Sequence, residues 1–273
     1  MDLAEKLHHL KMSSGELAVC WLGQAGFLMK DSRGNTLVID PYLTNCGERL
    51  RGFKRLSPVL LKPKDLSPDY YIITHLHFDH FDYDTVPLVI QQSPDTLFLG
   101  PASCQDKLLE LGAPPERVRS LNRNEEYRDD AVAMRGILAD HGAMAPDAIG
   151  VLLEMEGHRL YFSGDTAFRE TLFREVALFK PDVAMFSING RFGNMNAQEG
   201  ARAAALSGVK YGIPCHFWTF AEHGGDPGEF CQCLRSGGQC QPLCFRQGEI
   251  QILNEANQIV HPSGELFYRK ESA

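Results

Sequence analysis

One stretch of the chain joins a buried strand to a dense group of metal-binding side chains: Tyr70-Tyr71-Ile72-Ile73-Thr74-His75-Leu76-His77-Phe78-Asp79-His80. Residues 70–74 form a short, continuous apolar run, which is typical of a buried strand. His75 and His77 are two residues apart in extended chain, so their rings project to the same side and can bind one metal ion. Asp79 and His80 then offer an oxygen and a nitrogen to a second ion, and Asp82 is a candidate to orient these ligands. This density favours a metal site over a polar surface loop.

Three more potential ligands follow other predicted strands. His141 comes after the strand predicted at 131–139, Asp165 after the one at 159–163, and His216 after the one at 209–213. Sheets of α/β type place their sites at the carboxyl ends of strands. Together with the run at 75–80, these residues make a set of five imidazoles and two carboxylates.

The order of predicted elements indicates the fold class. Strands are expected at 17–22, 27–30, 36–40, 70–74, 96–99, 131–139, 148–155, 159–163, 182–186 and 209–213, with two more near the end of the chain. Helices are expected at 82–92, 103–111, 168–179, 196–206 and 227–234. Strands come first in each half and then alternate with helices, which predicts an α/β (α+β) fold of two sheets packed face to face with helices outside. No linker-like tract is found, so we expect a single domain over residues 1–273.

Composition restricts the partners. The chain has 273 residues and a formal net charge of −8, and an acidic protein repels the phosphate backbone of nucleic acids. The longest early apolar stretch, at 17–29, is too short and too interrupted to span a membrane. The first twelve residues lack the apolar segment of a secretory signal, so we expect a cytoplasmic protein without a membrane partner. A basic stretch at 49–64 is expected to be a solvated loop rather than an anion-steering one.

Cysteines and the remaining histidines have weaker interpretations. Four cysteines lie close together in the sequence, and their spacing favours plain reduced thiols over a structural zinc site: Cys231, Cys233, Cys240 and Cys244. Five histidines lie outside the strand-end pattern and are expected to be solvated: His8, His9, His158, His223 and His261. Of these, His223 could line the mouth of a pocket.

The motifs together resemble those of a known family. The pattern His75-x-His77-x-Asp79-His80, the segment Ser163-Gly164-Asp165 and the late His216 resemble the metallo-β-lactamase superfamily. Flanking segments resemble its L-ascorbate-6-phosphate lactonase-like branch, and they lie at 21–27, 39–42, 187–196 and 213–216. The resemblance covers nearly the whole chain. One departure is His216-Phe217-Trp218, where the lactonase has a His-His-Asp run, so aromatic groups replace polar ones beside the site.

The resemblance implies a four-layer αβ/βα sandwich of two mixed sheets flanked by helices, and a site for two divalent ions. His75, His77 and His141 would hold the first ion, and Asp79, His80 and His216 would hold the second. Asp165 would bridge them, and Asp40 would orient a ligand histidine. Nitrogen and oxygen ligation fits zinc or manganese, and iron as well. Relatives of the lactonase commonly assemble, which implies a homo-oligomer.

The expected activity is hydrolysis. Two bound cations lower the pKa of a water between them from ~15.7 toward ~7, and the resulting hydroxide can open a lactone or ester bond. Asp79 or Asp165 would orient this nucleophile and pass a proton to the leaving group. The expected substrate is a small, anionic, sugar-phosphate-like metabolite. The alternatives are a phosphodiesterase or nuclease on the same scaffold, and a non-catalytic metal-binding scaffold protein.

Four residues near strand ends are candidates for contact with the substrate: Tyr42, Asn189, Arg191 and Asn194. Arg191 could pair with a substrate phosphate or carboxylate. Asparagine is also a good turn residue, so ordinary loop chemistry explains the same pattern equally well.

Overall fold

The computed structural model describes residues 2–238 and 240–260, which form two sheets. The first sheet has the strand order β15-β14-β1-β2-β3-β4-β5-β6. Its strands are β1 (Leu17–Gly23), β2 (Gly26–Asp31), β3 (Thr36–Ile39), β4 (Tyr70–Ile72), β5 (Leu97–Gly100), β6 (Val118–Ser120), β14 (Ile250–Leu253) and β15 (Ile259–Val260). Strands β3 to β6 pair in parallel, and β15, β14, β1, β2 and β3 pair antiparallel. The sheet is therefore mixed.

The second sheet is also mixed, with the order β13-β12-β11-β10-β9-β8-β7. Its strands are β7 (Glu126–Arg128), β8 (Val132–Leu138), β9 (Ile149–Met155), β10 (His158–Phe162), β11 (Val183–Ser187), β12 (Tyr211–Cys215) and β13 (Gln241–Pro242). Strands β10 to β13 run parallel, and β7 to β10 run antiparallel. Hydrophobic side chains of both sheets pack into one cluster between them, including Val19, Phe27 and Leu153. The burial of these inner faces is the main force that holds the sheets together.

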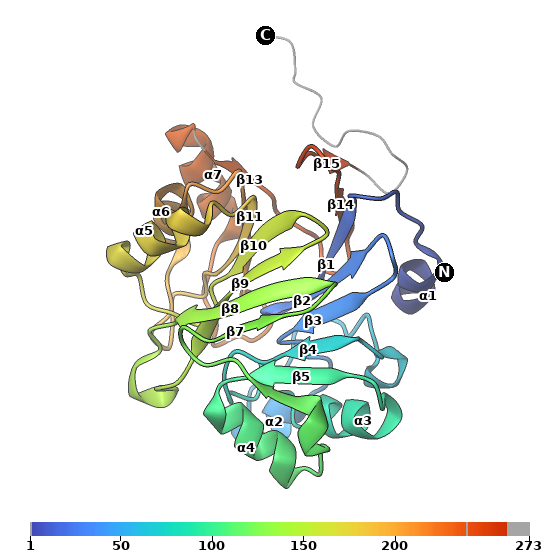
Figure 1. Cartoon of the computed structure of the whole chain (residues 1–273). Helices are drawn as coiled ribbons and strands as arrows, with labels where there is room; N and C mark the ends of the chain where they lie inside the picture. The colour runs from blue at the N-terminus through green and yellow to red at the C-terminus, as the bar shows by residue number, and fades with distance from the viewer. Residues whose placement is uncertain (1, 239, 261–273) are drawn as a thin grey trace.

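Helices cover the outer face of each sheet (Figure 1). The helices α1 (Leu3–His9), α3 (Thr85–Gln92) and α4 (Ala102–Glu110) share a second core with the first sheet. The helices α5 (Glu170–Phe179), α6 (Ala197–Ser207) and α7 (Pro227–Gly237) pack on the second sheet. Both faces of the first sheet are therefore buried. In strand β1, for example, Val19 belongs to the core between the sheets and its neighbour Cys20 to the core under the helices. The predicted four-layer αβ/βα fold is confirmed.

The described chain also contains elements that the sequence pattern did not predict. The basic stretch at 49–64 overlaps the end of helix α2 (Cys46–Arg51) and includes the short 3₁₀ turn at Pro63–Asp65, and its basic side chains other than Arg55 are exposed as expected. Within it, Arg55 is half-buried and donates to the carbonyls of Tyr42 and Thr44. Two further 3₁₀ turns lie at Pro115–Arg117 and Gly142–Met144. The helix expected from residue 82 begins at Thr85.

Several single-residue expectations can be placed in the fold. His8 and His9 are exposed as expected, but the prediction that His158 is solvated is wrong. Its ring is buried and lies 2.6 Å from Asn257 Oδ1 and 3.0 Å from the Gly15 carbonyl. His261 lies outside the described residues. Within the described part of the chain, no helix is long and apolar enough to cross a membrane.

Of the four clustered cysteines, Cys231 and Cys233 lie on helix α7, and Cys240 and Cys244 follow it in the chain. Cys231 and Cys240 are buried, Cys233 is half-buried and Cys244 is exposed, and each is a free thiol. Among residues 2–238 and 240–260, the side-chain groups that could hold a metal ion include none of these cysteines.

Candidate metal centre

The run at 75–80 forms a tight turn directly after β4. The amides of His80 and Phe81 both donate to the carbonyl of His77. Asp82 holds this turn against the neighbouring loop, because its buried carboxylate accepts the amides of Leu43 and Thr44 at 2.8 and 2.9 Å. The structure therefore places Asp82 in the support of the loop rather than against any predicted ligand, unlike the expectation from the sequence.

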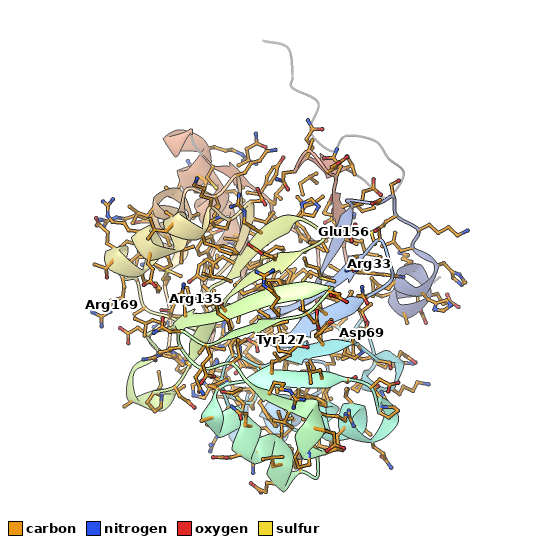
Figure 2. The ribbon with its side chains drawn as sticks, in the orientation of Figure 1. Arg33, Asp69, Tyr127, Arg135, Glu156 and Arg169 are labelled. Carbon is orange, nitrogen blue, oxygen red and sulfur yellow. The ribbon has the colours of Figure 1, made fainter. Side chains whose placement is uncertain are left out.

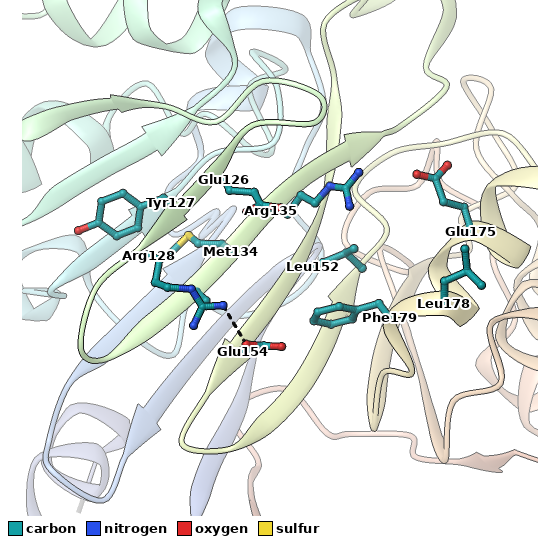
Figure 3. A pocket seen from close by; sticks show the side chains of 11 residues that line it. Glu126, Tyr127, Arg128, Met134, Arg135, Leu152, Glu154, Glu175, Leu178 and Phe179 are labelled. Atoms are coloured by element: carbon teal, nitrogen blue, oxygen red, sulfur yellow. Dashed lines mark hydrogen bonds and ion pairs between the residues drawn. The ribbon is translucent and has the colours of Figure 1, made fainter.

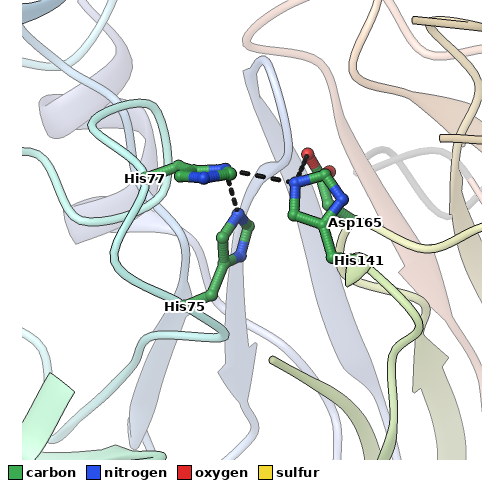
Figure 4. A group of neighbouring side chains, drawn as sticks. All are labelled: His75, His77, His141 and Asp165. Carbon is green, nitrogen blue, oxygen red and sulfur yellow. Dashed lines mark hydrogen bonds and ion pairs between the residues drawn. The ribbon is translucent and has the colours of Figure 1, made fainter. Parts of the chain in front are cut away.

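Four predicted ligands meet in a first group: His75, His77, His141 and Asp165 (Figure 4). Nδ1 of His77 lies 3.0 Å from Nε2 of His75 and 3.2 Å from Nε2 of His141. Oδ2 of Asp165 lies 3.7 Å from the same His141 nitrogen. The three imidazoles thus direct one nitrogen each toward a common point.

The other three predicted ligands meet in a second group: Asp79, His80 and His216. Nε2 of His216 lies 3.1 Å from Nε2 of His80 and 3.2 Å from Oδ2 of Asp79. Asp165 also reaches this group, since its Oδ1 lies 3.3 Å from the Nε2 atoms of both His80 and His216. One carboxylate therefore faces both groups, with a different oxygen toward each.

The donor atoms fit a bound cation. Two ligands of one tetrahedral zinc ion lie about 3.3 Å apart when the bonds are about 2.0–2.1 Å long. In the first group the ring nitrogen of His77 lies 3.0 and 3.2 Å from those of His75 and His141. In the second group the ring nitrogen of His216 lies 3.1 Å from that of His80 and 3.3 Å from Oδ1 of Asp165. These separations agree with the spacing of two ligands on one ion. Oδ1 of Asp165 is buried without a hydrogen-bond partner in the described structure, and buried polar atoms are rarely left so. The residues present therefore suit divalent ions.

A second layer of contacts fixes the orientation of His80. Oδ2 of Asp40 lies 2.7 Å from Nδ1 of His80, which leaves the Nε2 atom of that ring facing the second group. Asp40 is itself held, because its carboxylate accepts the Thr74 amide at 2.8 Å and the Thr74 hydroxyl at 2.6 Å. A histidine that gives its other N–H to a carboxylate is a common arrangement at metal sites. This is the position that the sequence analysis assigned to Asp40.

The electrostatics of the site favour a neutral His75 and a charged Asp165, and they favour positive charge at His80. Burial lowers the pKa of His75 well below its ordinary value, and the neighbouring His80 lowers it further. Burial alone would raise the pKa of Asp165, but His216 and His80 outweigh it and hold that pKa well below the usual range. Burial opposes a positive charge on His80, but Asp165, Asp40 and Asp79 outweigh it and hold the pKa of His80 well above its ordinary value. Three carboxylates around one ring make this a favourable place for a cation.

Gln24 is a site residue that the sequence analysis did not single out. Its side chain is fully buried and its Nε2 donates to Oδ2 of Asp79 at 2.6 Å. The backbone carbonyl of Gln24 accepts the Trp21 indole N–H and the His216 amide, both at 2.9 Å. Gln24, Asp40 and His216 all have positive φ angles of 46–60°. Such strain persists where the surroundings fix it, and it gathers at functional sites.

The loop that carries His141 is tied to the segment after Asp165. The Asp140 amide donates to the Thr166 hydroxyl at 2.9 Å, and the Ala167 amide donates to the Asp140 carbonyl at 2.8 Å. Arg169, which is labelled in Figure 2, lies at the surface and forms an ion pair with the Asp140 carboxylate. These contacts bring His141 to the first group although its loop has no regular strand.

The four predicted substrate-contacting residues have different surroundings. Tyr42 is 1 % exposed, and its hydroxyl accepts the Gly47 amide, so its placement does not favour contact with a substrate. Asn189 and Asn194 are buried on the loop between β11 and α6, and both atoms of each side-chain amide lack a hydrogen-bond partner in the described structure. Arg191 is exposed on the same loop.

A separate cavity lies away from these residues. It has a volume of about 450 Å³ and is lined by side chains of β7, β8, β9 and α5, among them Tyr127, Arg135 and Phe179 (Figure 3). Arg128 and Glu154 form an ion pair of 3.3 Å across part of it. None of the predicted ligands lines this cavity, so we assign the chemistry to the histidine and aspartate groups instead.

The fold and site define a class of protein, which comparison with known families identifies. A model of the beta-lactamase superfamily domain matches residues 18–216. The chain belongs to the metallo-β-lactamase superfamily. Together with the histidine and aspartate groups, this membership makes it a metal-dependent hydrolase of that fold.

Relatives agree with this assignment. The chain is 30 % identical to a UPF0173 metal-dependent hydrolase of Symbiobacterium thermophilum over 244 residues, which cover 87 % of this chain and all of that protein. It is 26 % identical to a UPF0173 metal-dependent hydrolase of Methanosarcina mazei, over 87 % and 99 % of the two chains.

Solved structures show the same fold. A metallo hydrolase of the archaeon Ignicoccus hospitalis superposes with a TM-score of 0.72 at 22 % identity, over 87 % of this chain and 98 % of the other. An isothiocyanate hydrolase from Delia radicum gut bacteria superposes with a TM-score of 0.68 at 20 % identity, over 85 % and 97 %.

Proposed function

We propose that the chain hydrolyses a lactone or ester bond of a small, anionic metabolite, with two divalent ions, zinc or manganese, as cofactors. One observation carries this proposal, namely that Asp165 directs one carboxylate oxygen to each group of ligands. His75, His77 and His141 would hold one ion, and Asp79, His80 and His216 the other, with Asp165 between them. Such an arrangement is typical of two-metal hydrolases.

When bound, such ions supply a nucleophilic hydroxide at neutral pH and stabilise negative charge on the attacked oxygen. The side chains of this protein supply orientation. Asp40 fixes the ring of His80, and Gln24 holds the Asp79 carboxylate through its amide. Asp79 and Asp165 are the acids and bases within reach of the reacting atoms, and either can carry a proton to the leaving oxygen.

The polar part of the substrate would bind at the loop between β11 and α6. Asn189 and Asn194 present buried amides without partners, and an unpaired buried amide costs about 1–3 kcal/mol until it is bonded. A hydroxyl or carbonyl of the substrate would satisfy them. Arg191, exposed on the same loop, supplies a positive charge for a carboxylate or phosphate. Together these groups favour a small substrate that carries both an anionic group and a hydroxyl or carbonyl.

Hydrolysis of simple lactones by the metal-loaded protein tests this proposal. Proton release should follow addition of a lactone, and Asp165→Asn should lower kcat/KM by about 100-fold or more. Asp31→Asn is a matched control, because Asp31 is equally buried but lies in the turn between β2 and β3, where it accepts the Arg33 and Asn35 amides. Absence of hydrolysis of lactones and esters by fully metal-loaded protein would contradict the proposal.

A further inference from the structure

Aromatic side chains from four separate segments gather beside the candidate metal centre. We call them the aromatic cluster: Phe53, Phe78, Phe192, Phe220 and His223. Phe53 lies at its middle, with its ring centroid 5.4 Å from that of Phe78, 5.6 Å from Phe220 and 5.9 Å from Phe192. The segments are the loop after α2, the turn at 75–80, the loop between β11 and α6, and the loop between β12 and α7. Distances of this size are those of packed aromatic pairs.

The cluster adjoins the second group of ligands. The His223 ring stacks on the His216 ring with a centroid distance of 4.8 Å and an interplanar angle of 18°. Its Nδ1 lies 3.4 Å from Nε2 of Gln24. Phe78 comes directly before Asp79 in the chain. An apolar group resting on the cluster would therefore lie next to Asp79 and His216.

The cluster is only partly covered by the protein itself. Phe220 is 1 % exposed and forms the floor, whereas Phe192 is 46 % exposed and Phe53, Phe78 and His223 are half-buried. Phe192 also has a φ angle of +54°, which is unfavourable for a bulky residue. Core packing cannot explain why a strained backbone presents a large apolar ring to solvent. Contact with a ligand can.

The side chains of the aromatic cluster favour an uncharged, apolar group on that ligand. Four of the five rings of the aromatic cluster are phenylalanine rings, which carry no charge and offer an anion no hydrogen-bond donor. The nearby guanidinium of Arg55 is turned away, 4.1 Å over the Tyr42 ring and donating to backbone carbonyls. The rings of the cluster give a phosphate no partner, whereas a flat apolar group has several rings to rest on.

We propose that the aromatic cluster is the specificity subsite of the enzyme and binds an aromatic ring of the substrate next to the bond that is cleaved. This inference rests on the proposed function and narrows its substrate class. The substrate would place its polar groups toward Asn189 and Asn194 and its ring against Phe53 and Phe192. It would be an aryl-substituted lactone or ester rather than a bare sugar phosphate.

Calorimetric titration of the metal-loaded protein with phenylacetate and with acetate tests the subsite. These two carboxylates differ only by the ring, and one good aromatic contact corresponds to about tenfold in affinity. We expect phenylacetate to bind about tenfold more tightly. Phe192→Gly should abolish this preference while keeping the positive φ that glycine accepts readily. Leu178→Ala is the control, because Leu178 is 81 % exposed on α5 and should leave the preference unchanged.

Two lactones, one with a phenyl and one with a methyl substituent, separate failure of the subsite from failure of the proposed function. Hydrolysis of both lactones with equal kcat/KM, or equal affinity for the two carboxylates, would overturn the subsite and keep the hydrolase. A preference for phenylacetate without hydrolysis of either lactone would overturn the proposed function and keep the subsite. A preference that survives in Phe192→Gly would overturn the subsite as well.

Discussion

Replacing Asp40 by asparagine tests how the site holds its ions. The carboxylate lies 2.7 Å from Nδ1 of His80 and accepts two further hydrogen bonds from Thr74. Asparagine keeps the shape but removes the charge, so the bond to His80 changes from a charge-assisted one, worth about 1.5–3 kcal/mol, to a neutral one, worth about 0.5–1.5 kcal/mol. The ring becomes less basic and less firmly oriented. Changes of this kind lower metal affinity about 10–100-fold, or by about 1.4–2.8 kcal/mol.

The assay is a competition titration in which a chromophoric chelator competes with the protein for zinc. We expect weaker binding of the ions by Asp40→Asn and unchanged binding by Asp31→Asn, whose carboxylate is equally buried but far from the ligands. The free energy of unfolding of both metal-free variants, measured with urea, separates general destabilisation from an effect on the site. Wild-type zinc affinity in Asp40→Asn would refute the role given to this residue.

Two further predictions concern parts of the fold outside the metal centre. Asn196→Ala should lower the free energy of unfolding by about 1 kcal/mol, because Asn196 and Glu199 cap the start of α6 with reciprocal hydrogen bonds of 2.9 and 3.0 Å. Urea denaturation measures this loss, and an unchanged midpoint would contradict it. The neighbouring thiol of Cys231 lowers the pKa of Cys244 to about 7. The thiolate fraction rises with pH, so alkylation of Cys244 should reach half its maximal rate near pH 7. Cys20 should stay unreactive, because burial raises its pKa to about 12. Mass spectrometry follows both thiols, and alkylation of Cys20 before Cys244 would contradict the assignment.

The sequence predicts most of the fold and the positions of the seven candidate ligands, because both depend on local patterns. His75, His141, Asp165 and His216 each follow the end of a strand that its apolar side chains reveal. Folding does not change how many residues separate a buried strand from the polar residue that follows it. The fold then brings the strand ends together.

Other features depend on contacts between distant segments and have no local signal. His158 is buried because it meets Asn257, 99 residues away. Gln24 reaches Asp79 only after the ends of β1 and β4 come together, although a polar residue between Gly23 and Gly26 in an apolar region was a usable hint. Helix α1 is a different case, because it does have a local signal that the sequence analysis missed. This signal is a capping box, in which Asp2 and Glu5 bond each other's backbone amides.

Closeness in sequence to the ligands was a misleading guide for two residues. Asp82 lies two positions after His80, yet its carboxylate binds the amides of the neighbouring loop. Tyr42 follows Asp40 closely, yet its ring lies beneath Arg55 and beside Phe220. Polar side chains next to a site often hold the backbone of its loops, because those loops leave amides that need partners.

The central claim is that the two groups of ligands together bind two ions, which elemental analysis of the purified protein tests most directly. We predict about two divalent ions per chain in the wild type and a sharp fall in both His77→Ala and Asp165→Ala. His8→Ala, which changes an exposed histidine on α1, should keep the full amount. Less than one ion per chain, unchanged by these substitutions and not restored by added zinc or manganese, would contradict the claim.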